Sequence, residues 1–208
     1  MGNVRDMEKQ LRRAARADVS GAALRASAAL ADRAAHEHLL DVAYTTLDSP
    51  VGPVLVAATR RGLVRISFGA AYDEEAVLAD LCARISPRVV EAPAYFDAVR
   101  RELDEYFHGQ RTRFDLPLDW SLTGGFGRRV LERTARIEYG AVSTYREVAA
   151  AAGSPRGARA AGNALGANPI PIVVPCHRVL HSGGGLGGYG GGVDRKEFLL
   201  KLEGAIRG

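Results

Sequence analysis

Hydrophobic and polar positions alternate along residues 42–68, VAYTTLDSPVGPVLVAATRRGLVRISF. Three runs rich in Val, Ile, Thr and Tyr are separated by the turn-forming sequences SPVG and RRG. Such residues favour strands, and glycine and proline mark the turns between them. The pattern therefore predicts three short strands that follow one another as a meander.

After this meander the apolar spacing becomes helical. It predicts helices over about 73–85 and 94–107, and Gly109 follows the second one where a C-cap glycine belongs. The segment RTRFDLPLDW, residues 111–120, is typical of an extended chain. Residues 41–117 are thus expected to form a small α+β unit.

Residues 118–208 are predicted to be mostly helical. An amphipathic stretch, residues 126–140, should form a helix that stops at Gly140. A further helix should start at Ser143, a good N-cap, with Glu147 near the capping-box offset. The final helix should cover residues 194–204 with Asp194 as its N-cap.

Two short helices are joined by a tight turn between residues 143 and 168. The sequences STYREVAAAAG and ARAAGNALGAN flank the turn SPRG. This arrangement is the helix-turn-helix pattern. The second helix is built of small residues and carries a single charged side chain, Arg159. Arg159 could act as a wedge against another surface or simply face solvent, and the sequence leaves both open.

Residues 1–40 are rich in Ala and Arg. We expect a partly helical or a flexible extension there, so the chain divides into segments 1–40, 41–117 and 118–208. The fold class is α+β. No stretch approaches the length of an apolar membrane helix, and the N-terminus lacks the apolar region of a secretory signal. We therefore expect a cytoplasmic protein that does not enter a membrane.

Charge is distributed unevenly along the 208 residues. Residues 118–208 contain 12 Lys or Arg against 7 Asp or Glu, whereas residues 41–117 contain 9 against 12. A basic excess on the segment that also carries the helix-turn-helix favours an anionic partner.

The stretch IPIVVPCHRVLHSGGGLGGYGGG, residues 170–192, places a thiol beside an imidazole. A cysteine nucleophile acts as a thiolate and needs a base. Side chains of neighbouring residues in extended backbone point to opposite sides, so Cys176 and His177 should not touch directly. We expect His177 to activate Cys176 through a water, with Glu203 orienting the imidazole.

Eight glycines between residues 183 and 192 follow the Cys-His pair. Backbone without side chains can approach a ligand closely. Gly183, Gly185 and Gly188 match G-x-G-x-x-G, but no βαβ unit surrounds them, so a dinucleotide site is rejected. Tyr189 is the bulky exception and could close over a planar ring.

The other cysteine, Cys82, lies in the helical sequence AVLADLCARI. This setting is typical of a small core residue. Two cysteines are too few for a disulfide framework or for a four-thiolate metal site.

Together, NPIPIVVPCHRV, the upstream ARAAG and the downstream GGYGGG and KEFLLKLEG resemble the O6-alkylguanine-DNA alkyltransferases, also called methylated-DNA–protein-cysteine methyltransferases. The likeness is strong over residues 124–204, looser over 41–117, and does not cover 1–40. It implies a small ribonuclease-H-like N-terminal domain, followed by a mostly helical domain with the helix-turn-helix and the reactive cysteine.

The resemblance also implies roles for single residues. Cys176 would accept the alkyl group, with His177 as the water-linked base, Glu203 orienting it and Asn168 bracing the preceding turn. The substrate and DNA contacts it implies are Tyr145, Arg159, Val174, Tyr189, Gly190 and Gly191. Arg159 would be the finger that fills the gap left by an extruded nucleotide.

The implied activity is DNA repair by direct reversal. One alkyl group would move from O6-alkylguanine, or O4-alkylthymine, in double-stranded DNA to the protein's own cysteine, once per molecule. We expect no cofactor, no metal and a monomer. Some relatives hold a structural zinc through Cys and His, but Cys82 stands alone in residues 41–117.

Two other functions remain possible from the residues. One is a helix-turn-helix protein that binds DNA lesions and in which Cys176 is inert. The other is a cysteine hydrolase, which would turn over repeatedly and lacks a facing histidine here.

Overall fold

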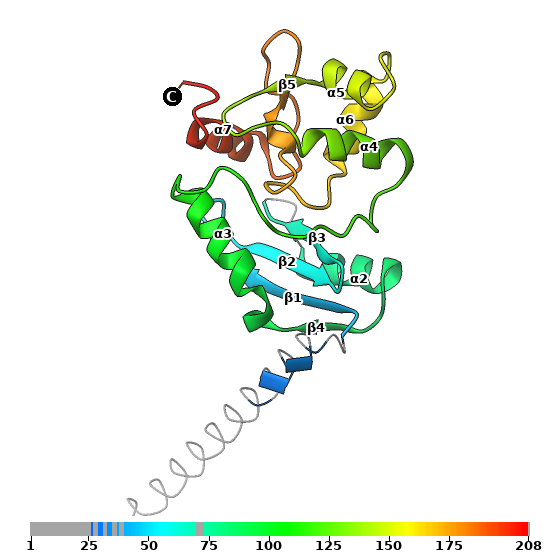
Figure 1. Cartoon of the computed structure of the whole chain (residues 1–208), viewed down its shortest axis with the longest axis vertical. Coiled ribbons are helices and arrows are strands. Elements are labelled where there is room, and N and C mark those ends of the chain that lie inside the picture. Colours follow the sequence, from blue (N-terminus) through cyan, green and yellow to red (C-terminus); the bar gives the residue numbers. More distant parts are fainter. Residues whose placement is uncertain are drawn as a thin grey trace, which may run out of the picture.

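The three predicted strands pair as an antiparallel meander. They are β1 (Val42–Leu47), β2 (Val54–Thr59) and β3 (Gly62–Ser67). A fourth strand, β4 (Val89–Glu91), was not predicted and pairs in parallel with β1. The sheet order is β3-β2-β1-β4, so β3 is the edge nearest the helical half of the molecule (Figure 1).

This computed structural model describes residues 40–69 and 73–207, with a few positions before them (26, 29–30, 33–34 and 37). The partly helical or flexible extension expected over residues 1–40 therefore lies almost entirely outside the described residues.

Two helices flank the sheet where helices were predicted. Helix α2 (Glu74–Arg84) is capped by Asp73, whose side chain accepts hydrogen bonds from two N–H groups of the first turn. Helix α3 (Asp97–Phe107) follows a 3₁₀ turn, η1 (Pro93–Phe96), so only the first turn of the expected helix differs. Gly109 lies just past α3 with a φ of 69°, as expected for a C-cap glycine.

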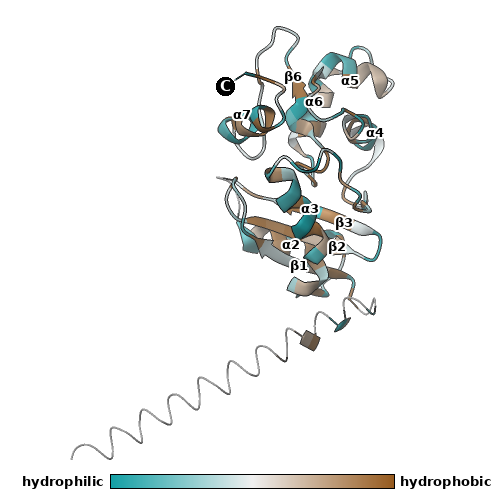
Figure 2. Ribbon diagram, turned by 60° about the vertical axis from the view of Figure 1, so that its left-hand side comes forward, coloured by the Kyte–Doolittle hydropathy of each residue, from teal (hydrophilic) through white to brown (hydrophobic). Residues whose placement is uncertain are grey.

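Strand β2 is buried along its whole length because helices cover both faces of the sheet. Val54 and Val56 pack into the large core that includes α3, whereas Leu55 and Ala57 pack with residues of α2. This alternation is the two-residue period of a strand. Figure 2 shows the apolar strands at the centre, with more hydrophilic helix surfaces around them.

The free edge of β3 is covered by main-chain hydrogen bonds from other segments. The N–H of Leu63 donates to the Pro117 carbonyl, and the N–H of Asp119 donates to the Leu63 carbonyl, both at 2.8 Å. The segment expected to be extended over 111–120 contributes a single bridge, between Leu118 and Leu63. Further along the edge, the N–H of Ile66 donates to the Pro169 carbonyl at 2.8 Å. The sheet is thereby joined to the segment that precedes Cys176.

Helix α4 (Gly125–Thr134) is shorter than predicted and ends six residues before Gly140. The backbone turns instead, and the carbonyl of Ile137 accepts a hydrogen bond from Nη1 of Arg178. The predicted helix over residues 126–140 is thus correct only in its first part.

Helices α5 (Tyr145–Ala151) and α6 (Ala158–Gly166) confirm the predicted pair of short helices joined by a turn. The N-cap of α5 is Thr144, not Ser143, and it forms a complete capping box with Glu147. Ser143 belongs instead to the two-residue strand β5 (Ser143–Thr144), which pairs in parallel with β6 (Val179–Leu180).

Helix α7 (Val193–Leu202) begins one residue before the predicted Asp194 cap. Its N-cap is Gly192, whose φ of 96° favours glycine. Asp194 lies in the first turn, where the helix dipole favours a carboxylate. In the part of the chain that is described, no helix combines the length and apolar composition needed to span a membrane.

Candidate active site

The segment between α6 and Cys176 is a turn, although extended backbone was expected at Cys176 and His177. Its only pairing is an isolated bridge between Pro171 and Val174, and Ile172 has a φ of 74°. A β-branched residue rarely adopts this left-handed conformation. Cys176 itself opens the 3₁₀ helix η2 (Cys176–Arg178). The expectation of extended backbone at Cys176 and His177 is therefore wrong.

Asn168 explains why the chain turns here. Its Nδ2 donates to the Val174 carbonyl at 2.8 Å and to Sγ of Cys176 at 3.1 Å. Its Oδ1 accepts a hydrogen bond from the N–H of Ile170 at 3.0 Å. One amide side chain thus holds both ends of the turn and touches the sulfur, which stabilises the strained Ile172 between them.

Cys176 is buried, with 7% of its surface exposed. Burial raises the pKa of the Cys176 thiol to about 11, although the hydrogen bond from Asn168 and the charge of Lys196 act in the opposite direction. The thiol is therefore protonated at neutral pH. It can act as a nucleophile only if a base removes its proton as the reaction occurs.

His177 is fully buried and bonded to Glu203. Nε2 of His177 lies 2.9 Å from Oε1 of Glu203. Burial on its own would raise the pKa of Glu203, but hydrogen bonds from His177 and Arg178 outweigh it and lower the pKa to about 2. Burial lowers the pKa of His177, which the nearby Glu203 only partly opposes, so the imidazole is neutral at pH 7.

The ionised carboxylate fixes the tautomer of this neutral imidazole. A carboxylate can only accept, so Nε2 of His177 carries the hydrogen and Nδ1 has a free lone pair. Nδ1 is buried and has no hydrogen-bond partner among the described residues. His177 therefore presents an unoccupied basic nitrogen inside the protein, next to the residue that carries the thiol.

Glu203 receives more donors than the sequence indicated. Arg178 donates from Nε to Oε2 at 2.8 Å and from Nη2 to Oε1 at 2.9 Å. The hydroxyl of Tyr106, from α3, donates to Oε1 at 2.6 Å. Arg178 could have been inferred from its place beside His177. Tyr106 is 97 positions from Glu203 in the chain, and no sequence pattern pointed to it.

A cavity of about 600 Å³ opens onto Cys176. It brings together five predicted site residues, namely Cys176, Tyr145, Arg159, Tyr189 and Gly190. Sequence reasoning missed the other lining residues, which come from α6 and the glycine loop: Ala158, Gly162, Leu165, Gly166, His181 and Gly188. His177 and Glu203 do not line it and are buried behind the sulfur.

Small residues on α6 give the cavity its width. Gly162 faces the ring of Tyr145, and a Cβ there would lie 3.7 Å from that ring. The ring of His181 also packs against the Tyr145 ring, with 5.1 Å between the two ring centroids. Arg159 is exposed at the cavity and forms no ion pair within the described residues.

Val174 and Gly191 are not placed in this cavity. The Val174 carbonyl already accepts hydrogen bonds from Nδ2 of Asn168 and from the N–H of Cys176, each at 2.8 Å. Gly191 is buried against Phe68, where a Cβ would come within 2.5 Å of the ring. Gly191 and Asn168 line a second cavity of about 440 Å³, which meets the first at Cys176.

A buried lysine lies on the other side of the Tyr145 ring. Lys196 donates from Nζ to the Val179 carbonyl at 2.6 Å, and its ammonium lies 5.9 Å from the Tyr145 ring centroid. Burial lowers the pKa of Lys196 to about 8. Cys82, predicted to be a core residue, is only half-buried on α2. No cluster of three His, Cys, Asp or Glu that could hold a metal was found among the described residues.

The fold and the site define a protein of two parts, one with a ribonuclease-like sheet and one with a helix pair beside a buried cysteine. Two family models match these parts. Residues 42–120 match the ribonuclease-like domain of 6-O-methylguanine DNA methyltransferase, and residues 125–205 match its DNA-binding domain. The chain belongs to the 6-O-methylguanine DNA methyltransferase family.

Individual relatives agree with this assignment. A methylated-DNA–protein-cysteine methyltransferase from Methanosarcina barkeri is 40% identical over 160 residues, 77% of this chain and 96% of the relative. The crystal structure of the Mycobacterium tuberculosis O6-methylguanine methyltransferase has 39% identity and a TM-score of 0.68, covering 79% of this chain and 93% of the other. A structure of the M. tuberculosis OGT protein in complex with DNA has 38% identity and a TM-score of 0.67, covering 78% and 93%.

Proposed function

We propose that this protein is a methylated-DNA–protein-cysteine methyltransferase that repairs DNA by accepting alkyl groups from O6 of guanine, and from O4 of thymine, on Cys176. One observation carries the proposal. The sulfur of Cys176 lines a cavity large enough for a base, and a neutral imidazole oriented by a carboxylate is buried behind it.

The chemistry follows from the protonation states. Nδ1 of His177 takes the thiol proton through a bridging water, and the sulfur forms a bond to the alkyl carbon. The bond between that carbon and O6 breaks, and its electron pair stays with the guanine, which takes up a proton from solvent. The imidazolium of His177 returns the thiol proton to solvent. The hydrogen bond from Asn168 stabilises the developing thiolate. Because the product is a thioether, each molecule reacts once.

The reacting base must leave the DNA stack, because the sulfur lies inside the protein. In this proposal Arg159 fills the space that the base leaves, and Tyr145, Tyr189 and Gly190, which line the same cavity, surround the base. The short side chains of α6 permit close contact with the minor groove. Val174 is omitted from these contacts because its carbonyl has no free lone pair.

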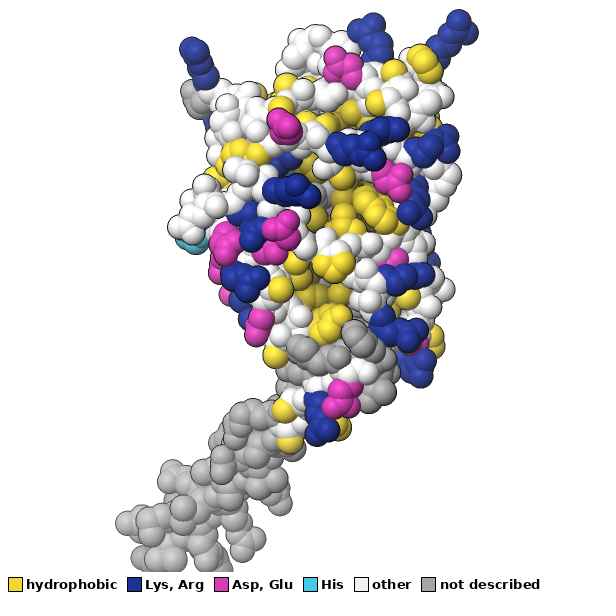
Figure 3. All heavy atoms as spheres, in the orientation of Figure 1, with side chains coloured by type: hydrophobic (Ala, Val, Ile, Leu, Met, Phe, Trp, Pro, Cys, Tyr) yellow, Lys and Arg dark blue, Asp and Glu magenta, His cyan; other side chains and the backbone are white. Residues whose placement is uncertain are grey.

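Basic side chains supply the sequence-independent part of DNA binding in this proposal. The face shown in Figure 3 carries Lys and Arg side chains over both halves of the molecule, around exposed apolar patches. Arg146, Arg156 and Arg159, from α5, the turn and α6, are exposed and available to the DNA backbone in this proposal.

A single experiment tests the proposal. The protein is incubated with duplex DNA containing one O6-methylguanine, and its intact mass and the mass of the Cys176 peptide are measured. We expect one methyl group per protein, confined to Cys176, and none on the Cys176→Ala variant, which should still bind the DNA.

Two other results would each overturn the proposal. Unmodified protein that binds the lesion tightly would identify a non-catalytic DNA-binding protein. Repeated turnover without a covalent product would identify a cysteine hydrolase.

A further inference from the structure

The carboxylate of Glu203 is completed by a residue from the opposite half of the molecule. Tyr106 lies on α3, which packs against the sheet, and its hydroxyl reaches Oε1 of Glu203 at the end of α7 (Figure 1). Both side chains are buried, with Tyr106 fully inaccessible. The same oxygen accepts hydrogen bonds from His177 and Arg178.

The position of Tyr106 is determined independently of Glu203. Its ring packs against Phe107, Phe114 and Tyr139, with centroids 5.3 to 6.1 Å away. These contacts allow little freedom for the phenol ring. The hydroxyl is therefore held toward Glu203 by packing as well as by the hydrogen bond itself.

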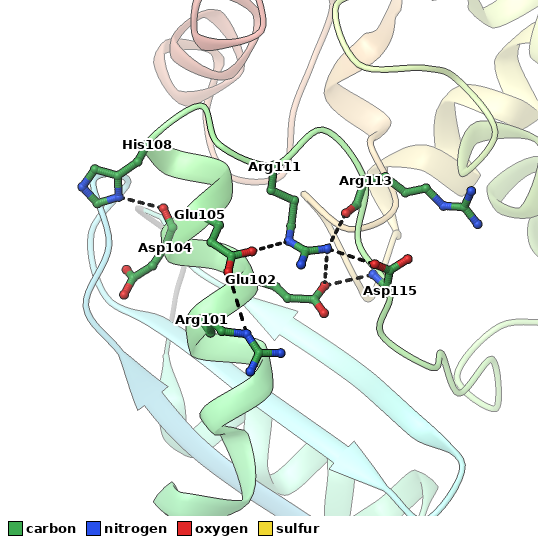
Figure 4. Close-up of polar contacts among 8 residues, drawn as sticks. All are labelled: Arg101, Glu102, Asp104, Glu105, His108, Arg111, Arg113 and Asp115. Atoms are coloured by element: carbon green, nitrogen blue, oxygen red, sulfur yellow. Dashed lines mark hydrogen bonds and ion pairs between the residues drawn. The ribbon is translucent and has the colours of Figure 1, made fainter.

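The end of α3 is fixed by a second set of contacts, shown in Figure 4. Arg111 lies beyond the helix and points back to it, donating from Nε to Glu105 at 2.8 Å. Its Nη1 lies 3.3 Å from the buried Glu102 and 3.2 Å from Asp115. Glu102 is one turn before Tyr106, so this ion-pair cluster anchors the turn of α3 that carries the tyrosine.

The hydroxyl of Tyr106 stays protonated at every pH at which the protein works. Burial and the charge of Glu203 raise the pKa of Tyr106 well above its usual value. The phenol is thus a permanent donor to a permanent carboxylate. Each donor on Oε1 withdraws negative charge from the oxygen that also faces Nε2 of His177.

We propose that Tyr106 is a positioning residue that sets the basicity of His177 by sharing the Glu203 carboxylate. The inference rests on the proposed function only in assigning His177 the role of base for Cys176. With the phenol in place, Glu203 orients the imidazole without stabilising its protonated form strongly. His177 then remains neutral, and its Nδ1 remains available to accept the thiol proton.

The test compares Tyr106→Phe with Tyr139→Phe. Each change removes one hydroxyl from the same aromatic cluster, but the hydroxyl of Tyr139 donates to the Leu202 carbonyl at 3.0 Å and not to Glu203. The pKa of His177 is followed by NMR titration. The rate of Cys176 alkylation is measured between pH 5 and 9 with iodoacetamide and with O6-benzylguanine, alongside thermal unfolding.

For Tyr106→Phe we expect the pKa of His177 to rise by about 0.5 to 1 unit, because the carboxylate regains charge. The acid limb of the alkylation rate should move up by the same amount, which lowers the rate about three- to tenfold at pH values well below the pKa of His177. Tyr139→Phe should leave both titrations unchanged, whatever its effect on unfolding. A shared loss of stability with unmoved titrations in both variants would overturn the proposal.

The two reagents separate this inference from the proposed function. Iodoacetamide reports the nucleophilicity of the thiol and needs no guanine recognition. If wild-type protein reacted with iodoacetamide but not with alkylguanine in any form, the proposed function would fail, while the comparison of the tyrosine variants would still decide the role of Tyr106.

Discussion

The thiol of Cys176 is protonated at neutral pH, although the proposed reaction uses its sulfur as the nucleophile. A pKa of about 11 protects the thiol from chance electrophiles, because little thiolate exists at neutral pH. In the proposed mechanism, reaction requires a substrate held in the cavity long enough for His177 to accept the thiol proton. Burial thus gives selectivity at the level of a single residue, and the Asn168 hydrogen bond keeps the sulfur in place meanwhile.

Glu203 should make protein stability depend on acid pH. Its pKa of about 2 in the folded state lies below the usual value of 4.5, so its contribution is present above pH 4.5 and is lost as pH falls toward 2. The shift corresponds to about 3 kcal/mol of unfolding free energy at neutral pH. Urea unfolding of wild type and Glu203→Gln at pH 7, 5 and 3 should show a difference that shrinks at the lowest pH.

A difference that stayed constant across these pH values would contradict this prediction. Should Glu203→Gln not fold at pH 7, the carboxyl carbon of Glu203 can be titrated by NMR in the wild-type protein. A titration midpoint near pH 4.5 for Glu203 would also contradict the expected pKa of about 2.

The candidate site residues were proposed from sequence, whereas their long-range hydrogen-bond partners were not. Cys176 and His177 are adjacent, and Glu203 closes a short final helix, so local pattern and family resemblance identified them. Tyr106 meets Glu203 only through the packing of α3 against the helical half. Long-range contacts of this kind leave no periodic signal in one sequence.

Element boundaries show which local rules were overridden. Extended backbone was expected at Cys176 and His177, but the two ends of the Asn168 amide hold the preceding residues in a turn. Helix α4 ends at Thr134, and the Ile137 carbonyl beyond it accepts a hydrogen bond from Arg178. In the turn before Cys176 one polar side chain decided the outcome, and propensity alone did not.

Helix α6 should affect the reaction with duplex DNA more than the reaction with a free alkylguanine base. Arg159→Ala should slow repair of O6-methylguanine in duplex DNA about tenfold or more, because nothing would then fill the space left by the extruded base. Reaction with free O6-benzylguanine should change much less, since that substrate needs no extrusion. Single-turnover rates on both substrates measure the effect, and equal losses would exclude the finger role.

At the scale of the whole molecule, the main-chain hydrogen bonds along β3 contribute as much as the core to joining the two halves. Two segments from outside the meander form main-chain hydrogen bonds with this strand, and one of them begins the turn that leads to Cys176. The α+β architecture and the helix pair were expected from periodicity. The way the sheet edge holds the reactive turn was not, because a hydrogen bond from Ile66 to Pro169 depends on the placement of both halves.

Residues 1–39 should be dispensable for the chemistry. The family match begins at residue 42, and Leu40 is the first described residue that packs against the core. The described main-chain bond before it, from Glu37 to Arg33, stays within the extension. A chain starting at Leu40 should transfer alkyl groups at a rate within about twofold of the full chain, because no core contact between described residues is lost. A tenfold loss would assign the extension a part in substrate binding.

The hydrogen bonds from the Tyr106 hydroxyl and from the Ile66 N–H would both be lost if the polypeptide were divided between residues 120 and 125. The carboxy-terminal fragment would keep every atom that reacts with the lesion. It would nevertheless lose the phenol that donates to Glu203 and the amide that donates to the Pro169 carbonyl. The surroundings of Cys176 would then lack two of the contacts that hold them in place. A minimal repair fragment of this protein has to include the sheet.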